Sequence, residues 1–260
     1  MKIYFCKHGY FGNNIFQYIV AKILCKEYGY QLVGSQNELV NPINVTDDLW
    51  YRWSIDKTLL GHADIFLNGF FQRLDLLYPY RDYIKTLFHK DNHEWINDSV
   101  RISDIANNYE TTDTPDDDEI VIHLRLGDFM HNNYNSHILH HEYYTQVLDR
   151  IYTGGKVTII SNKLTNHTEE QYVSRFDKYG AVFRSKTMLD DFNYIRKAKR
   201  VVSSNSTFAF IASFIGDPTE VYIPWTNFYK EQAVYPFIDN CSIINARCID
   251  IYSNTVRNYL

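Results

Sequence analysis

The feature that most constrains the fold is a regular alternation of apolar strand patterns and helical patterns in the second half of the chain. Strands are expected at 119–125, 156–160, 181–184, 200–204 and 220–224. Helices are expected near 141–152, 168–178 and 188–198, with a further one that opens at Ser206 or Thr207. Strands that alternate with helices of this length need crossover connections, which are right-handed and give a parallel, doubly wound sheet.

The first half begins with the same kind of unit. A short apolar strand at 2–6 leads through a glycine-containing turn into a helical pattern that runs from Asn14 to Gly29. A second apolar strand is expected at 64–71, followed by a helical stretch to about His89. The polar, acidic stretch at 107–118, broken by Pro115, is typical of a linker. The pattern therefore predicts two α/β domains, residues 1–115 and residues 116–260.

Composition excludes several classes of function. The chain has 260 residues and a formal net charge of −5, and no local basic patch stands out, so a nucleic-acid partner is not expected. The four cysteines form no C-x-x-C pair, which argues against a zinc site and a disulfide framework and fits a reducing compartment. The opening residues form no signal peptide and no run of 18 apolar residues occurs, so we expect a cytoplasmic protein without an integral membrane segment.

Three chemically active residues lie at the end of an apolar strand, in the stretch VIHLRLGDFM at 121–130. They are His123, Arg125 and Asp128. In a parallel, doubly wound sheet, ligands bind beyond the carboxyl ends of the strands, which is where these side chains are expected. An arginine at such a position can donate a bidentate pair of hydrogen bonds to a phosphate.

A second strand end carries small hydroxyl residues. The stretch from Ser203 to Thr207 leads from a buried strand into an apolar helix, and it holds more hydroxyl groups than capping one helix requires. A helix N-terminus also attracts anions. In the first half, Gly9 and Gly12 either bring backbone close to a ligand or make a turn. Two such loops together with Arg125 suggest a diphosphate ligand.

Several motifs in one order resemble the family of α-1,2-fucosyltransferases, glycosyltransferase family 11, over nearly the full length of the chain. GYFGNNIFQYIVA at 9–21 resembles that family's N-terminal segment, and LNGFFQRLDLLYP at 67–79 is similar to its G-Y-F-Q segment. HLRLGD at 123–128 resembles the H-x-R-R-x-D donor motif. HILHHEYYTQVL at 137–148 and VVSSNSTFAFIASFIG at 201–216 are similar to the two later motifs.

This resemblance implies a GT-B-like, inverting transferase that moves fucose from GDP-fucose to a sugar hydroxyl of a glycan. Its second half would hold the nucleotide sugar, and the glycan acceptor would enter between the halves. Arg125 would bind the donor diphosphate, His123 would lie near the nucleotide, and the donor site would be completed by Asn205, Ser206, Thr207, Gly12 and Asn13. Such enzymes work without a cofactor or a bound metal, since cations and helix N-termini stabilise the departing diphosphate. The acidic run at 116–118 precedes its strand, so we interpret it as a solvated linker and not as a metal ligand set.

Two departures from the family pattern leave alternatives open. Leu126 stands where the family has a second arginine, and Ala209 and Phe210 replace a tryptophan pair. A related transferase that uses another nucleotide sugar, such as UDP-xylose, and a non-catalytic carbohydrate-binding relative therefore remain alternatives.

The catalytic base is not decided by the sequence. Asp128 is the first candidate by position, although it would equally serve to orient Arg125. His131, Glu142 and His8 are the other candidates for the general base.

Overall fold

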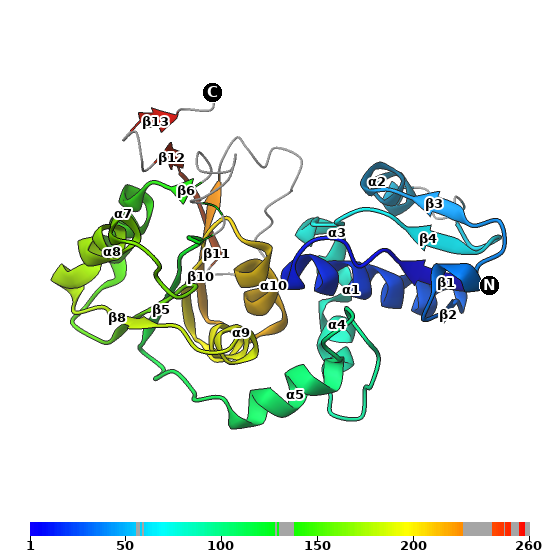
Figure 1. The fold of residues 1–260 in the computed structure, drawn as a ribbon, viewed down its shortest axis with the longest axis horizontal. Coiled ribbons are helices and arrows are strands. Elements are labelled where there is room, and N and C mark those ends of the chain that lie inside the picture. The colour runs from blue at the N-terminus through cyan, green and yellow to red at the C-terminus, as the bar shows by residue number, and fades with distance from the viewer. Residues whose placement is uncertain are drawn as a thin grey trace. The chain divides into compact units, whose positions relative to one another are not determined.

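The computed structural model describes residues 1–55, 58, 60–127, 129, 138–225, 241–246, 248–250 and 255–257. The chain folds as two compact units, Met1–Ala106 and Asn107–Leu260, and each contains its own parallel sheet (Figure 1). The expected α/β architecture with a parallel sheet in each half is confirmed. The division falls inside a helix, α5 (Ile102–Thr111), and so precedes the acidic stretch in which the sequence placed it.

Unit 1 is built on a four-stranded sheet with the strand order β2-β1-β4-β3. All three strand pairs are parallel. The strands are β1 (Lys2–Phe5), β2 (Gln31–Leu32), β3 (Ile43–Val45) and β4 (Ile65–Leu67). The expected strands at 2–6 and 64–71 correspond to β1 and β4, the two central strands, while the short β2 and β3 were not foreseen.

Helices and short 3-10 turns accompany these strands in the described residues of this part of the chain. They are α1 (Phe11–Tyr28), η1 (Gln36–Glu38), α2 (Asp47–Ile55), α3 (Leu74–Leu77), η3 (Tyr78–Tyr80), α4 (Arg81–Leu87) and α5. Helix α1 is buried along most of its length, because its apolar residues face both the sheet and the rest of the unit. It begins at Phe11, so Gly12 and Asn13 belong to its first turn and not to the glycine turn that the sequence suggested.

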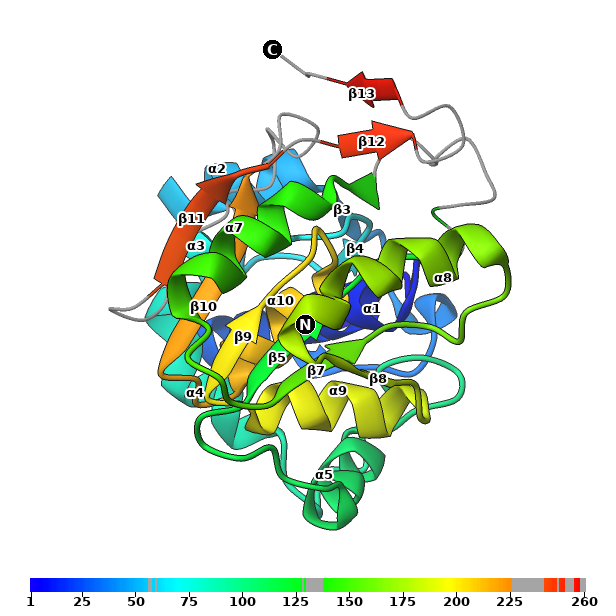
Figure 2. The same cartoon turned by 90° about the vertical axis from the view of Figure 1, so that its left-hand side faces the viewer.

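Unit 2 contains a six-stranded parallel sheet with the order β11-β10-β9-β5-β7-β8, which can be followed in Figure 2. The chain starts at β5 in the centre, moves outward through β7 to β8, and returns to add β9, β10 and β11 on the other side. This is the doubly wound order expected from the sequence. The strands are β5 (Ile120–His123), β7 (Val157–Ile160), β8 (Val182–Arg184), β9 (Arg200–Val202), β10 (Glu220–Trp225) and β11 (Cys241–Asn245).

Helices cover both faces of this sheet, as Figure 1 shows. α7 (His141–Ile151) and α8 (His167–Val173), with the 3-10 turn η5 (Ser174–Tyr179), pack on one face. α9 (Met188–Lys197) and α10 (Thr207–Ile215) lie on the other face. The expected helices in this half are therefore confirmed, with ends that differ by a few residues. A small antiparallel sheet joins β6 (Ile138–Leu139), β12 (Cys248–Asp250) and β13 (Thr255–Arg257), none of which was predicted.

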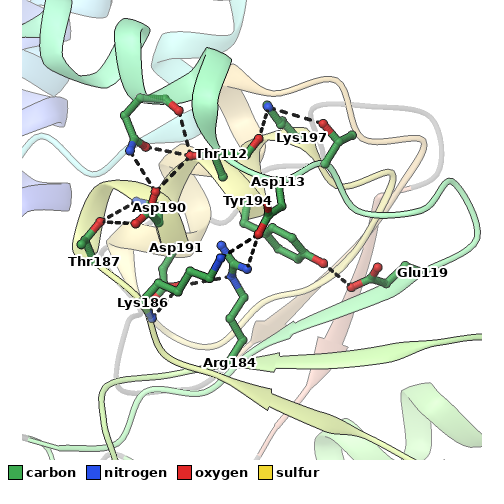
Figure 3. A network of polar contacts seen from close by, with 12 residues as sticks. Thr112, Asp113, Glu119, Arg184, Lys186, Thr187, Asp190, Asp191, Tyr194 and Lys197 are labelled. Atoms are coloured by element: carbon green, nitrogen blue, oxygen red, sulfur yellow. Dashed lines mark hydrogen bonds and ion pairs between the residues drawn. The ribbon is translucent and has the colours of Figure 1, made fainter.

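A network of polar contacts connects helix α9 with the segment that follows α5 (Figure 3). The carboxylate of Asp113 accepts from Lys186 Nζ at 2.7 Å and from Arg184 Nη1 at 3.3 Å. Thr112 and Asn108 bind Asp190 at the start of α9. Burial raises the pKa of Asp191 to about 6, although the backbone N–H of Lys186 and the guanidinium of Arg184 act in the opposite direction. The network thus fixes the entry of the chain into unit 2.

The amino end of the same sheet carries an ion pair with a buried carboxylate. Glu119 is fully buried, and its carboxylate pairs with Lys156 Nζ at 2.8 Å and accepts from the hydroxyl of Tyr194 at 2.7 Å. The acidic residues 116–118 are exposed in the turn that precedes β5, at this end of the sheet. No helix in the part of the chain that the structure describes is long and apolar enough to cross a membrane.

Candidate functional site

The candidate site lies where the strand order of unit 2 reverses. β5 and β9 are adjacent and parallel at the centre of the sheet, yet the chain leaves β5 toward β7 and leaves β9 toward β10. In doubly wound sheets, ligands bind at this reversal point, beyond the carboxyl ends of the strands. The residues that the sequence singled out in unit 2 follow these two strands.

His123 is the last residue of β5 and is 94% removed from solvent, with a relative exposure of 6%. Its Nδ1 lies 2.7 Å from the hydroxyl oxygen of Ser204, so this hydrogen bond joins the ends of β5 and β9. The ring also packs against Phe208 of α10, with ring centroids 5.6 Å apart. Burial, together with the nearby Arg125 cation, lowers the pKa of His123 to about 3. The imidazole is therefore neutral at ordinary pH.

Side chains at the end of β5 alternate between two environments. Leu124 and Leu126 are almost completely buried, with exposures of 1% and 2%, in the apolar cluster beneath α7. His123 is absent from this cluster and contacts Ser204 and Phe208 of α10 instead, as alternation along an extended strand requires. Arg125 follows after the end of the strand. The guanidinium carbon of Arg125 lies 4.6 Å from the ring centroid of Phe129. Arg125 is half-buried, so it keeps access to a ligand at the sheet edge.

Leu126 is consequently a core residue. In the resemblance to the fucosyltransferases it stands in place of a second arginine, but its side chain packs with Leu124 in an apolar cluster from which His123 is absent. A leucine at this position is therefore no evidence that the donor is a nucleotide sugar other than GDP-fucose. Gly127 follows with a φ of +65°, and a Cβ there would come within 2.8 Å of the Asn162 amide nitrogen, so the turn after β5 requires glycine.

Burial and hydrogen bonds hold the loop after β9 in one conformation. Ser203 and Ser204 are fully buried. The Ser203 hydroxyl donates to the carbonyl of Ser204 at 3.0 Å, and the Tyr143 hydroxyl lies 3.0 Å from the carbonyl oxygens of both Ser203 and Tyr222. Two of the five hydroxyl or amide residues in this loop therefore serve to hold the backbone and His123 in position.

The N-terminus of α10 differs from those of neighbouring helices. Asn166 and Thr187 cap α8 and α9 by accepting from the backbone N–H groups of Glu169 and Asp190. Ser206, at the corresponding position of α10, makes no such side-chain hydrogen bond, and no acidic residue lies in the first turn. The first N–H groups of a helix carry partial positive charge and bind anions. The loop 203–207 can therefore present an anion site beside Arg125.

The structure thus brings His123, Arg125, Asn205, Ser206 and Thr207 to two neighbouring strand ends of unit 2. Asp128 and His131 lie outside the described residues. Gly12 and Asn13 lie in unit 1, where Gly12 is buried and Asn13 Oδ1 accepts from Gln72 Nε2 at 2.7 Å. The assignment of these two residues to the donor remains a prediction.

A pair of histidines at the start of α7 was not singled out by the sequence. The rings of His140 and His141 are 4.3 Å apart, and His140 Nδ1 lies 3.3 Å from a carboxylate oxygen of Glu142. Burial, together with the nearby His140 and Arg175, lowers the pKa of His141 to about 4. His141 is therefore neutral at ordinary pH. The other candidate base, His8, is an exposed residue of unit 1 whose carbonyl accepts from Asn14 and Gln17.

Comparisons with known proteins add a resemblance of fold. No family model and no curated protein matches the sequence. Among solved structures, the E. coli heptosyltransferase WaaC with ADP has a TM-score of 0.46 and 9% identity over 94% of this chain and 91% of that one. POFUT1 in complex with GDP and with GDP-fucose has a TM-score of 0.37 and 11% identity over 85% of this chain and 73% of that one.

The chain is structurally similar to these glycosyltransferases. With TM-scores below 0.5, the likeness carries no conclusion about substrate or residue roles, which rest on the geometry of the site.

Proposed function

We propose that the chain is a GT-B-like, inverting glycosyltransferase that moves fucose from GDP-fucose to a sugar hydroxyl of a glycan. The observation that carries this proposal is the convergence of Arg125, the neutral His123 and the loop 203–207 at the reversal point of the unit 2 sheet. A cation and a helix N-terminus without a side-chain cap suit a nucleotide diphosphate. The ordered motifs shared with α-1,2-fucosyltransferases support fucose as the transferred sugar.

In this proposal the protein stabilises the leaving group with its own positive charge. The charge on the diphosphate grows as the glycosidic bond breaks, and Arg125 together with the first N–H groups of α10 would interact with it more strongly at that moment. The Ser204 hydroxyl holds His123 in one orientation near the nucleotide. No cluster of three or more His, Cys, Asp or Glu side chains that could hold a metal occurs among the described residues.

The acceptor hydroxyl needs a base on the face opposite the diphosphate. Asp128 is proposed for this role, because it follows Arg125 closely in the sequence and matches the acidic residue of the donor motif. Unit 2 would hold the donor and unit 1 the acceptor. Gly12 and Asn13, in the first turn of α1, are proposed as further donor-binding residues on the basis of the motif resemblance.

The first experiment measures nucleotide binding and donor use. GDP is expected to raise the melting temperature of the protein more than UDP or ADP, because ligands that bind only the folded state stabilise it. Incubation with GDP-fucose and a set of galactosides should release GDP, and the rate in excess EDTA should match that of the untreated protein. Turnover of UDP-xylose without turnover of GDP-fucose would overturn the donor while leaving the reaction class intact.

A non-catalytic carbohydrate-binding protein gives a different result. Such a protein would bind a glycan, but neither nucleotides nor nucleotide sugars would change its melting temperature. Replacing Arg125 would then have no effect on any binding constant. That combination of results would contradict the transferase proposal as a whole.

A further inference from the structure

Two loops of unit 1 present large aromatic side chains at the carboxyl edge of its sheet. One loop follows β1 and contains Tyr10, which is 69% exposed. The other follows β4 and contains Phe70, which is 44% exposed. β1 and β4 are the adjacent central strands of the sheet, so both loops leave the same edge side by side. In parallel α/β sheets this is the edge at which ligands bind.

The loop after β4 holds Phe70 on a strained and well-anchored backbone. The next residue, Phe71, has a φ of +55°, although bulky residues rarely adopt this left-handed conformation. Its side chain is fully buried and packs edge-on against Trp50. The carboxylate of Asp47 accepts from the backbone N–H groups of both Phe70 and Phe71. Such strain persists only where the surroundings enforce it, and it is concentrated at ligand sites.

The loop after β1 is tied to the same structure. Gln17 is fully buried, and its Nε2 donates to the carbonyl of His8 at 3.2 Å and to the carbonyl of Gly69 at 2.9 Å. Gly9 has a φ of +79°, and a Cβ there would lie 3.0 Å from Cε1 of Phe70. The edge of the Phe70 ring therefore rests against the Gly9 backbone. This contact fixes the position of a half-exposed aromatic ring before any ligand arrives.

Polar groups border the aromatic residues. Asn13 Oδ1 and Gln72 Nε2 are hydrogen-bonded at 2.7 Å beside the loop. Arg73 forms a two-point contact with the carboxylate of Asp75, and its guanidinium carbon lies 4.9 Å from the ring centroid of Tyr51. A flat apolar face with hydrogen-bonding groups around it matches a sugar ring, which has apolar C–H faces and hydroxyl groups at its rim.

We propose that Phe70, together with Tyr10, forms a stacking platform for a pyranose ring of the glycan acceptor. This inference rests on the proposed function and deepens it, because it assigns an acceptor subsite to unit 1. Glycan is favoured over a protein partner because two aromatic residues bordered by polar groups make a small patch, whereas protein interfaces need larger apolar areas. Phe70 binds the acceptor in this proposal and takes no part in the chemical step.

The test compares Phe70→Ala and Phe70→Trp with a control, Trp95→Ala, in the full chain. Trp95 is also in unit 1 and is 43% exposed, but it packs on Arg101 in a different segment. With lactose or methyl β-galactoside as acceptor, Phe70→Ala should raise the acceptor KM about 3- to 10-fold, the size expected for one aromatic contact. Phe70→Trp should keep the acceptor KM near that of the parent. The affinity for GDP should be the same in all variants.

Several results would overturn the platform. An unchanged acceptor KM in Phe70→Ala would do so, as would an equal increase in Trp95→Ala. Sedimentation that shows Phe70→Ala dissociating a dimer, with glycoside binding unchanged, would assign the patch to self-association instead.

Direct glycoside binding separates this inference from the proposed function. Saturation-transfer NMR with the same two glycosides does not depend on any donor. If the parent protein binds neither nucleotide nor nucleotide sugar, the proposed transferase activity fails, but loss of the glycoside signal in Phe70→Ala would still support the platform. Absence of any glycoside signal from the parent protein would refute it.

Discussion

Replacing Leu126 by arginine tests whether this position belongs to the donor site or to the core. Leu126→Arg restores the second arginine of the fucosyltransferase motif, and a simple reading of the motif predicts tighter donor binding. The structure predicts the opposite outcome. The side chain at 126 is 2% exposed and lies with Leu124, Ile138 and Leu139 in the apolar cluster beneath α7.

The size of the effect follows from what the substitution removes and buries. Loss of one fully buried leucine costs about 1.5–3 kcal/mol. An unpaired guanidinium in the same place adds several kcal/mol, reduced where the long side chain extends toward water. We expect a total of about 3–5 kcal/mol. For a unit of this size, each kcal/mol corresponds to roughly 2–4 °C, so the melting temperature should fall by roughly 6–20 °C.

Thermal unfolding followed by circular dichroism measures this change, and the GDP-release assay is run on the protein that remains folded. Leu126→Met is the matched control, because a swap of similar volume in a core costs less than about 1.5 kcal/mol. A melting temperature for Leu126→Arg equal to that of the parent, combined with a higher kcat/KM for GDP-fucose, would show that this side chain reaches the donor. The alternation argument for β5 would then be wrong.

Three further predictions concern the two ends of the unit 2 sheet. Arg125→Ala should lower kcat/KM roughly 10²- to 10³-fold in the GDP-release assay. Arg125→Lys should not restore the activity, since an ammonium group lacks the planar pair of N–H donors of a guanidinium. Normal turnover with a lower melting temperature would make Arg125 a structural residue. The pKa of buried His123 is about 3, against 6.5 for an exposed histidine, so the unfolded chain binds the proton at higher pH than the folded chain. The free energy of unfolding should therefore fall as the pH decreases from 6.5 toward 3. Urea titrations should show a flatter decline for His123→Gln, and an identical decline in both proteins would assign the pH dependence to another group. Glu119→Gln should lower the free energy of unfolding by about 1–3 kcal/mol, because it weakens the contact of a buried carboxylate with Lys156. GDP release by the folded protein should be unchanged, since Glu119 lies at the opposite end of the sheet from the loops that follow β5 and β9.

The sequence was most informative where apolar patterns are long. Apart from β6, the strands and helices described between 119 and 225 were placed to within a few residues, because each pattern is enclosed by polar turns and is buried on predictable faces. β2 and β6 were missed because two residues show no periodicity, and their pairing depends on neighbours distant in the chain. α1 extends back to Phe11 because burial in unit 1 outweighs the cost of a glycine in its first turn.

The candidate site was likewise predicted only in part from the sequence. The position of His123 and Arg125 at a strand end followed from the order of apolar residues. The hydrogen bond between His123 and Ser204 did not, since 81 positions separate the two residues and only the adjacency of β5 and β9 joins them. The burial of Leu126 was not predicted, because the resemblance directed attention to the arginine that it replaces; the apolar cluster beneath α7 accounts for it.

The alternation at the end of β5 makes this segment more sensitive to insertions than to many substitutions. His123 faces Ser204 and α10 while Leu124 and Leu126 face the cluster beneath α7, so one extra residue placed after Ile122 would exchange the two sides. A leucine would then face α10, and His123 would enter the apolar cluster. A single added residue would thus damage binding and folding at once, whereas an added pair would preserve the facing of every side chain. Among related chains, length differences at this strand end should therefore come in even numbers or be compensated within the turn at Gly127.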